Sequence, residues 1–128
     1  MLLNRNTILQ ATTLPYEDVE VAEWGGTVRV RGMTGRERDA LEQLVVGPDG
    51  KRKSIENFRG RVVATCAVDD SGTRLFTDAD AKLLGNNSAA ALERVFTVAL
   101  RLSGLSATDV ADLEKNSEDG QSEFSTSD

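Results

Sequence analysis

The residues that could bind a metal ion lie in one acidic stretch, Asp69-Asp70-Ser71-Gly72-Thr73, which is followed by Asp78 and Asp80. A standard calcium loop needs oxygen ligands at alternating positions and a bidentate glutamate at its twelfth position. Counted from Asp69, the twelfth residue is Asp80, and Asp70-Ser71-Gly72 does not supply the alternation. A turn followed by a helix N-terminus explains these residues better, so we expect no metal site.

The sequence lacks the groups that many enzymes use as general base and nucleophile. It contains no histidine, which excludes Ser-His-Asp and Cys-His arrangements. Its single cysteine, Cys66, excludes an internal disulfide and a four-thiolate zinc site. The neighbours of Cys66 are apolar, and a reactive thiol needs an activating partner, so we expect Cys66 to be a small buried residue.

Two further arrangements are weak indications of chemistry. Trp24-Gly25-Gly26 is not followed by the remaining residues of a phosphate-binding loop, so its glycines are expected to permit a tight turn. A pair of carboxylates could still converge in the fold, but a small domain with 5% aromatic residues is not expected to form a deep pocket. We therefore expect no enzymatic activity and no cofactor.

The uneven charge of the chain limits its partners. Residues 1–66 carry a net charge of +1 and residues 67–128 carry −7. Such acidity disfavours nucleic-acid binding, and we expect the basic cluster Lys51-Arg52-Lys53 to be a solvated loop, with a phosphate contact as the alternative. No apolar run approaches the ~20 residues of a membrane span, so we expect no membrane partner. The chain start lacks a secretory signal pattern, and a single cysteine is compatible with a reducing cytosol.

A β-hairpin is predicted near residues 18–22 and 27–31. Val19 and Val21 alternate with charged or small neighbours, and so do Val28 and Val30. Alternation with period two on both sides of a Gly-Gly pair predicts two strands with Trp24 at their turn. Because a lone two-stranded ribbon is marginal in water, this hairpin must pack against the helices that follow it.

Downstream of the hairpin, capping residues mark the starts of helices. Thr34 and Glu37 form a capping box that begins a helix running to about Val46. Further starts are predicted at Thr77 for Asp78–Leu84, at Ser88 for Ala89 to about Ser103, and at 106–109 for a last helix with Val110 and Leu113. A short extended piece is expected at residues 74–76.

Residues 54–68 are ambiguous between helix and strand. Ile55, Phe58, Val62 and Cys66 follow helical spacing, with Ser54 as a possible cap. Gly60 costs about 1 kcal/mol inside a helix, and residues 62–68 are rich in β-branched side chains. We favour a helix because the apolar spacing extends back to Ile55.

The helix beginning at Ala89 is unusually apolar, its strongly polar positions being Glu93, Arg94, Thr97 and Arg101. Such a helix is either central to the core or partly covered by a partner. Leu92, Phe96 and Leu100 on this helix, together with Trp24 at the hairpin turn, are therefore candidate partner-binding residues. The alternative is that they form the core.

These elements predict an α+β fold: a single, mostly helical domain with an N-terminal two-stranded β-hairpin. Residues 1–14 are expected to be a flexible leader, 15–115 the domain, and 116–128 a disordered acidic tail. The composition of this tail cannot bury enough apolar surface to offset its ordering entropy.

The order of several segments resembles the tail assembly chaperone family of long-tailed bacteriophages and prophages. The similarity covers roughly residues 14–117, and it is the ordered set that is specific, since each segment alone is only a turn, a cap or an amphipathic helix. One departure is Ser103, where the family pattern has Asn at a helix end. The segments are 24–35, which ends the hairpin and begins a helix, 37–39, 69–80, 90–96, 102–106 and 113–117.

This resemblance implies a role in assembly. Members bind the tape measure protein, keep it soluble, promote assembly of the tail tube, and then leave, so the expected location is the host cell cytoplasm and not the mature virion. The family also implies the tail tube protein as a partner, through a longer form made by translational frameshift and extended after Lys115. Self-association is a further possibility. The alternatives are a structural tail or head–tail component retained in the virion, and a small nucleic-acid-binding regulator, which the acidic charge disfavours.

Overall fold

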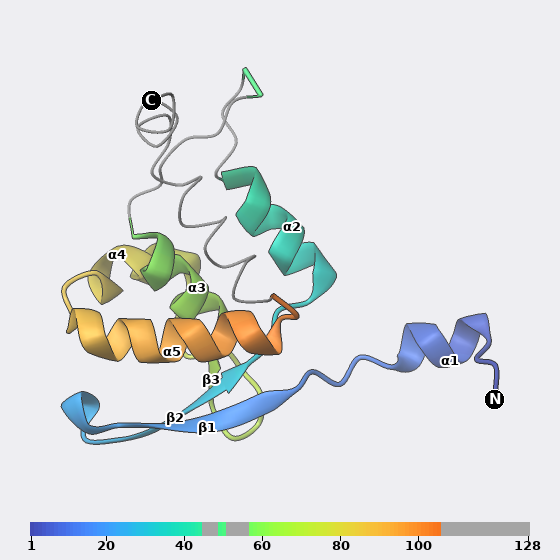
Figure 1. The fold of residues 1–128 in the computed structure, drawn as a ribbon, viewed down its shortest axis with the longest axis horizontal. Coiled ribbons are helices and arrows are strands. Elements are labelled where there is room, and N and C mark those ends of the chain that lie inside the picture. Colours follow the sequence, from blue (N-terminus) through green and yellow to red (C-terminus); the bar gives the residue numbers. More distant parts are fainter. Residues whose placement is uncertain (45–48, 51–56, 106–128) are drawn as a thin grey trace, which may run out of the picture.

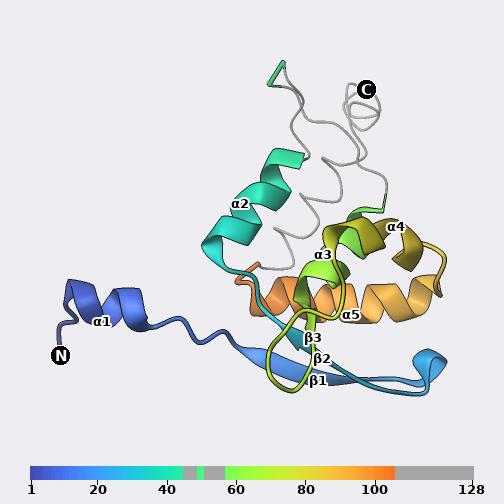
Figure 2. The same cartoon turned by 180° about the vertical axis from the view of Figure 1, so that it is seen from behind.

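The computed structural model describes residues 1–44, 49–50 and 57–105, which form a small antiparallel sheet covered on one face by helices (Figures 1 and 2). The predicted α+β class is confirmed. A short helix precedes the two long strands, and the other helices follow them. The elements are α1 (Arg5–Gln10), β1 (Tyr16–Val21), η1 (Ala22–Trp24), β2 (Gly26–Arg31), α2 (Gly35–Leu44), α3 (Phe58–Cys66), β3 (Ala67–Val68), η2 (Asp78–Asp80), α4 (Ala81–Leu84) and α5 (Ala89–Leu102).

The predicted hairpin is present, with β1 antiparallel to β2 and Val19 opposite Val28. Trp24 lies at the turn, in the 3₁₀ helix η1, and Gly25 follows it with a φ of 76°, a left-handed conformation that favours glycine. The sheet is larger than predicted, because β3 pairs with β2 and makes a third strand, in the order β1-β2-β3. This short strand supports one side of the hairpin and leaves β1 at the free edge.

The ambiguous segment is both helix and strand. The predicted helix is confirmed over Phe58–Cys66, while its expected start at Ser54 lies outside the described residues. The chain leaves the helix at Ala67, whose backbone is extended, and joins the sheet directly. The helical spacing was therefore informative for α3, whereas the β-branched composition did not mark the strand, because Val62, Val63 and Thr65 lie in α3 and Val68 alone lies in β3.

Gly60, which counted against a helix in the sequence, has a packing role. A Cβ added at this position would lie 2.7 Å from the carbonyl oxygen of Ala81, at the start of α4. The missing side chain therefore lets the α3 backbone approach α4 closely, so tertiary packing offsets the local helix penalty.

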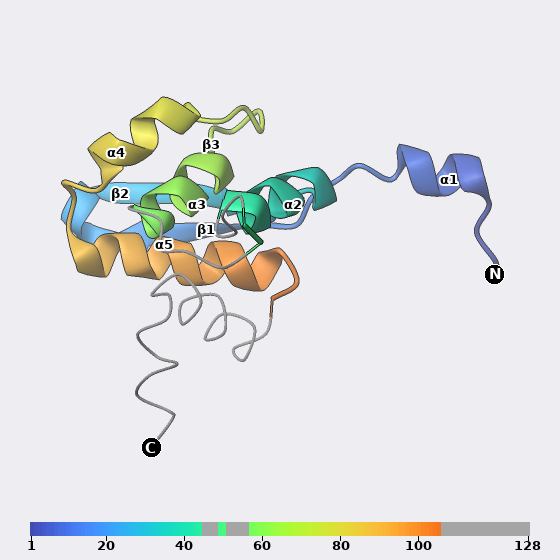
Figure 3. The same cartoon turned by 90° about the horizontal axis from the view of Figure 1, so that it is seen from above.

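The core lies between the inner face of the hairpin and helices α3 and α5 (Figure 3). Val21 and Val30 are fully buried beneath α5, and Val62 and Val63 of α3 are also fully buried. The outer face of the hairpin, with Tyr16 and Asp18, is exposed. The sheet therefore has one apolar covered face and one polar open face, as the alternation in the sequence predicts.

Each predicted helix start that lies within the described residues has the side-chain cap that the sequence indicates. The capping box at Thr34 is confirmed: its N–H donates to the Glu37 carboxylate at 3.0 Å, and its hydroxyl accepts from the Glu37 N–H at 3.1 Å. Thr77 and Asp80 form a second capping box at η2. Ser88 Oγ accepts from the Ala91 N–H at the start of α5.

The leader contains an element that the sequence did not predict. Helix α1 spans Arg5–Gln10, is capped by Asn4, and has no buried residue. Four of the sequence predictions concern residues that the structure does not describe. They are the helix end near Gly47, the basic cluster at 51–53, the last helix with Val110 and Leu113, and the tail 116–128.

A Gly60→Ala substitution is expected to destabilise the protein by about 1–2 kcal/mol, although alanine is the better helix former. The added methyl group would press on the Ala81 carbonyl oxygen. Gly35→Ala is the matched control, because a Cβ there meets nothing within 4 Å. It should leave stability unchanged or raise it by up to about 1 kcal/mol in urea unfolding followed by circular dichroism. Equal effects of the two substitutions would contradict the proposed close approach.

Glu37→Gln is expected to lower the free energy of unfolding by about 0.5–1 kcal/mol at pH 7. Burial acts to raise the pKa of Glu37, but hydrogen bonds from Arg31 and Thr34 outweigh it and hold this pKa below its ordinary value of 4.5. Ionised Glu37 therefore contributes stability above pH 4.5, and this contribution is lost as the pH falls through the lower folded pKa. The difference between wild type and variant should shrink in acid, as urea titrations at several pH values would show. A difference that grew in acid would contradict this account.

Candidate partner-binding surface

Three of the four predicted partner-binding residues are core residues in the structure. Phe96 and Leu100 are fully buried, and Leu92 is 6% exposed. The ring of Phe96 packs edge-on against Phe58 of α3, with ring centroids 5.8 Å apart. The alternative reading of this helix, a central core element, is therefore the one that the structure shows. Trp24 is half-buried and packs against the same core from the hairpin turn.

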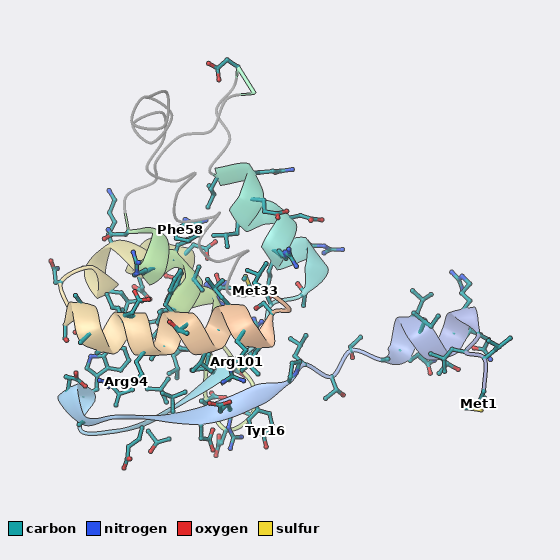
Figure 4. All side chains as sticks on the ribbon, viewed as in Figure 1. Met1, Tyr16, Met33, Phe58, Arg94 and Arg101 are labelled. Atoms are coloured by element: carbon teal, nitrogen blue, oxygen red, sulfur yellow. The ribbon has the colours of Figure 1, made fainter. Side chains whose placement is uncertain are left out.

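The polar side of α5 is bound to the hairpin by ion pairs. Arg94 donates to both carboxylate oxygens of Glu23, at 2.8 and 3.2 Å, and Arg101 donates to Glu17 at 2.7 Å. Figure 4 shows Arg94 and Arg101 on the side of α5 that faces the hairpin, Arg94 nearer the turn and Arg101 nearer the start of β1. The Arg94 partner lowers the pKa of Glu23 by hydrogen bonding. This side of α5 is thus occupied by contacts within the chain.

The acidic residues around 69–80 serve local structure. The Asp69 carboxylate accepts hydrogen bonds from the backbone N–H groups of Ser71 and Thr73, which closes the predicted turn and lowers the pKa of Asp69. Asp78 pairs with Arg74 at 2.9 Å, and this hydrogen bond lowers the pKa of Asp78. Within the described residues, no group of three or more acidic or thiol side chains is placed to hold a metal ion.

Cys66 is fully buried, as predicted. Burial raises the pKa of its thiol to about 12, and the nearby Arg31 guanidinium only partly opposes this effect. At neutral pH the side chain is therefore a protonated, unreactive part of the core.

An open cleft of about 470 Å³ lies between the end of α2, the start of α3 and the η2–α4 segment. Apolar contributions come from Leu44, Ala79 and Ala81, while the charged residues are Lys82 and the ion pair of Arg61 with Asp78, 3.5 Å apart. Helix α4 also exposes Leu83, which is 66% accessible. This end of the molecule therefore combines an apolar depression with charged side chains of both signs, and an amphipathic helix binds to apolar grooves of this general kind.

A second apolar region lies at the opposite end of the molecule, in the N-terminal arm, residues 1–10. Helix α1 projects away from the body, and Met1 lies at the tip of the arm (Figures 1, 3 and 4). Sequence reasoning missed this surface because the apolar residues follow no sustained period. The available signal was their number in so short a segment: Met1, Leu2, Leu3, Ile8 and Leu9 are all exposed.

None of the helices in the described ranges is long and apolar enough to cross a membrane.

Comparison with known proteins gives a likeness in fold. No family model matches the chain, and a search of curated proteins finds no match. The structure is similar to the solved structure of the tail assembly chaperone of bacteriophage HK97, with a TM-score of 0.55 and 18% sequence identity. The match covers 76% of this chain and 90% of the HK97 chain. At this identity the chain shares the fold of that chaperone, which agrees with the resemblance seen in the sequence.

Cys66 is expected to be inert toward a thiol reagent in the folded protein at pH 8, since its pKa is raised to about 12. Absorbance after addition of a chromogenic disulfide reagent should show no fast reaction until denaturant is added, when one thiol per chain reacts. Fast labelling of the native protein would contradict the buried, protonated state.

Proposed function

We propose that this protein is a tail assembly chaperone of a long-tailed phage or prophage, which binds the tape measure protein, keeps it soluble and promotes assembly of the tail tube. The observation that carries the proposal is the fold shared with the HK97 tail assembly chaperone over most of both chains. The ordered sequence segments that resemble the same family support it independently. The proposed role is non-enzymatic and needs no cofactor.

The proposed client-binding surface is the α4 cleft, which is lined by Leu44, Ala79 and Ala81, together with Leu83, an exposed residue of α4 outside that lining. The earlier candidates Leu92, Phe96 and Leu100 are already used by the core, so client contact must involve other apolar groups. A tape measure protein is long and helical, and an amphipathic helix binds by placing its apolar face in a shallow groove. Lys82 at the cleft would pair with an acidic residue flanking that face, whereas Arg61 is already paired with Asp78 at 3.5 Å.

Charge supports the solubilising part of the role. The net charge of the chain is −6, so several bound copies would cover an aggregation-prone client with like-charged surfaces. We propose that the tail tube protein is a second partner, recruited by a longer translational form that extends the chain after Lys115. The protein would act in the host cell cytoplasm and leave before the particle is complete.

The test is co-expression with the tape measure protein of the same phage or prophage. We expect the chaperone to move the tape measure protein into the soluble fraction and to co-purify with it. Leu83→Asp should weaken binding about tenfold, because it removes one large apolar contact worth on the order of 1.5 kcal/mol. Pull-down with the chaperone held at a series of concentrations measures this change.

Leu75→Asp is the matched control, since Leu75 is also an exposed leucine but is neither on α4 nor among the residues that line the cleft. It should leave binding unchanged. Equal binding by the wild type and both variants would reject the cleft as the surface, and an insoluble tape measure protein would reject the role. Mass spectrometry of purified particles separates the alternative, because a structural tail component would be found in the virion.

A further inference from the structure

The α4 cleft lies at the far end of helix α2 from the point where the described chain ends. The Met33 N–H donates to Ser103 Oγ at 2.8 Å, so the end of α5 is held beside the start of α2 (Figures 1 and 2). Helix α2 has ten residues, a length of about 15 Å, and its last residue, Leu44, lines the cleft. The chain that follows Leu105 therefore starts about one length of α2 away from the cleft.

The C-terminal segment, residues 106–128, is long enough to cross this distance. Val110 is five residues beyond Leu105 and can lie up to about 16–18 Å from it. A helix over residues 107–115, where the sequence predicts one, would be about 14 Å long, close to the length of α2. The segment can therefore reach the cleft without any change in the described domain.

The sequence of this segment has the pattern of a ligand for such a cleft. In a helix, Val110 and Leu113 lie on one edge, and Asp109 and Glu114 flank that edge on its two sides. An amphipathic helix binds by placing its apolar edge in a groove, with its charged groups at the margins. The chain thus carries the same type of segment as the proposed client.

Charge also favours this segment as the occupant of the cleft. Residues 106–128 carry seven Asp and Glu and one Lys, a net charge of −6, which leaves fourteen acidic and fourteen basic residues in 1–105. All of the net negative charge of the chain therefore lies in the C-terminal segment. At the cleft, Arg61 is paired with Asp78, but the Lys82 ammonium has no carboxylate partner among the described residues.

A basic cluster in the sequence adds to this complementarity. Lys51, Arg52 and Lys53 belong to the connection between Leu44 and Asn57, and both ends of that connection line the cleft. Lys53 is four residues before Asn57, so the chain keeps it within about 14 Å of that residue. An acidic segment is therefore attracted to the rim of the cleft, most strongly at low salt.

From these observations we propose that the α4 cleft is closed by the C-terminal segment of the same chain: Val110 and Leu113 cover its apolar lining, and the acidic residues beside them face Lys82 and the basic connection. A client helix must then displace this segment, so the cleft opens only to a helix that binds more tightly than the chain's own. This regulatory role rests on the proposed function. The docking itself does not, because the first two experiments below contain no tape measure protein.

The first test measures contact within one chain by disulfide formation. Ser117→Cys places a thiol about one helical turn after Leu113 on the same edge, and Ala79→Cys places the second thiol in the cleft lining. In mild oxidant this pair should close at least about tenfold faster than Ser117→Cys with Thr13→Cys, at a rate independent of protein concentration. Native Cys66 is buried and does not compete.

Thr13 is the matched control because it is exposed and lies near the base of the segment. The Pro15 carbonyl oxygen accepts from the Gly32 N–H at 3.0 Å, and Gly32 lies against the Leu102 carbonyl group. An undocked segment would therefore react with both partners at similar rates. Equal rates, or a product that consists of two chains joined together, would overturn the proposal.

The second test measures occupancy of the cleft with a labelled peptide of residues 106–119, by fluorescence anisotropy at low salt. The full chain carrying Val110→Asp and Leu113→Asp should bind this peptide at least about tenfold more tightly than wild type, because its own segment no longer competes at a high effective concentration. Adding Ala79→Asp should abolish binding, since it places a charge in the apolar lining. Equal binding by wild type and the double variant, or binding that survives Ala79→Asp, would overturn the proposal.

The same double variant links the docking to the proposed function. In pull-downs it should retain the tape measure protein at about tenfold lower concentration than wild type, because no segment has to be displaced. If the disulfide and peptide results are obtained but the tape measure protein is not bound, the proposed function fails and the docking stands. If the tape measure protein is bound but the first two results fail, the docking is overturned and the proposed function stands.

Discussion

The structure depends on one contact, the burial of the inner face of the hairpin by helix α5. Val21 and Val30 of the strands and Phe96 and Leu100 of the helix are all fully buried. Neither partner would be stable alone, because a two-stranded ribbon and an isolated 14-residue helix are both marginal in water. Covering one with the other removes both apolar surfaces from water and fixes the position of the remaining helices.

The polar margins of this contact set its geometry. Arg94 and Arg101 lie two helical turns apart on α5 and pair with Glu23 at the hairpin turn and Glu17 on β1. Exposed pairs of this kind add little stability, typically 0–1 kcal/mol. Two of them along one helix nevertheless favour a single orientation of that helix on the sheet, since a shift along its axis would separate both pairs at once.

Much of the fold could be predicted from local sequence, whereas the surface could not. The hairpin alternation, the Thr34–Glu37 box and the Ser88 cap involve neighbours in the chain, and all three predictions are confirmed. Strand β3 depends on pairing with β2, a distant segment, and no local pattern specifies it. The excess of apolar residues on α5 likewise could not show whether they form the core or bind a partner. That depends on whether distant segments, here the sheet and α3, cover the helix.

Because most apolar side chains of α5 are buried in the core, apolar surface for partners must come from elements at the edge of the fold. The described elements provide it at two ends, in the N-terminal arm and at α4 (Figure 3). Two distant apolar surfaces can be covered by different occupants at the same time, whereas a single surface can hold only one.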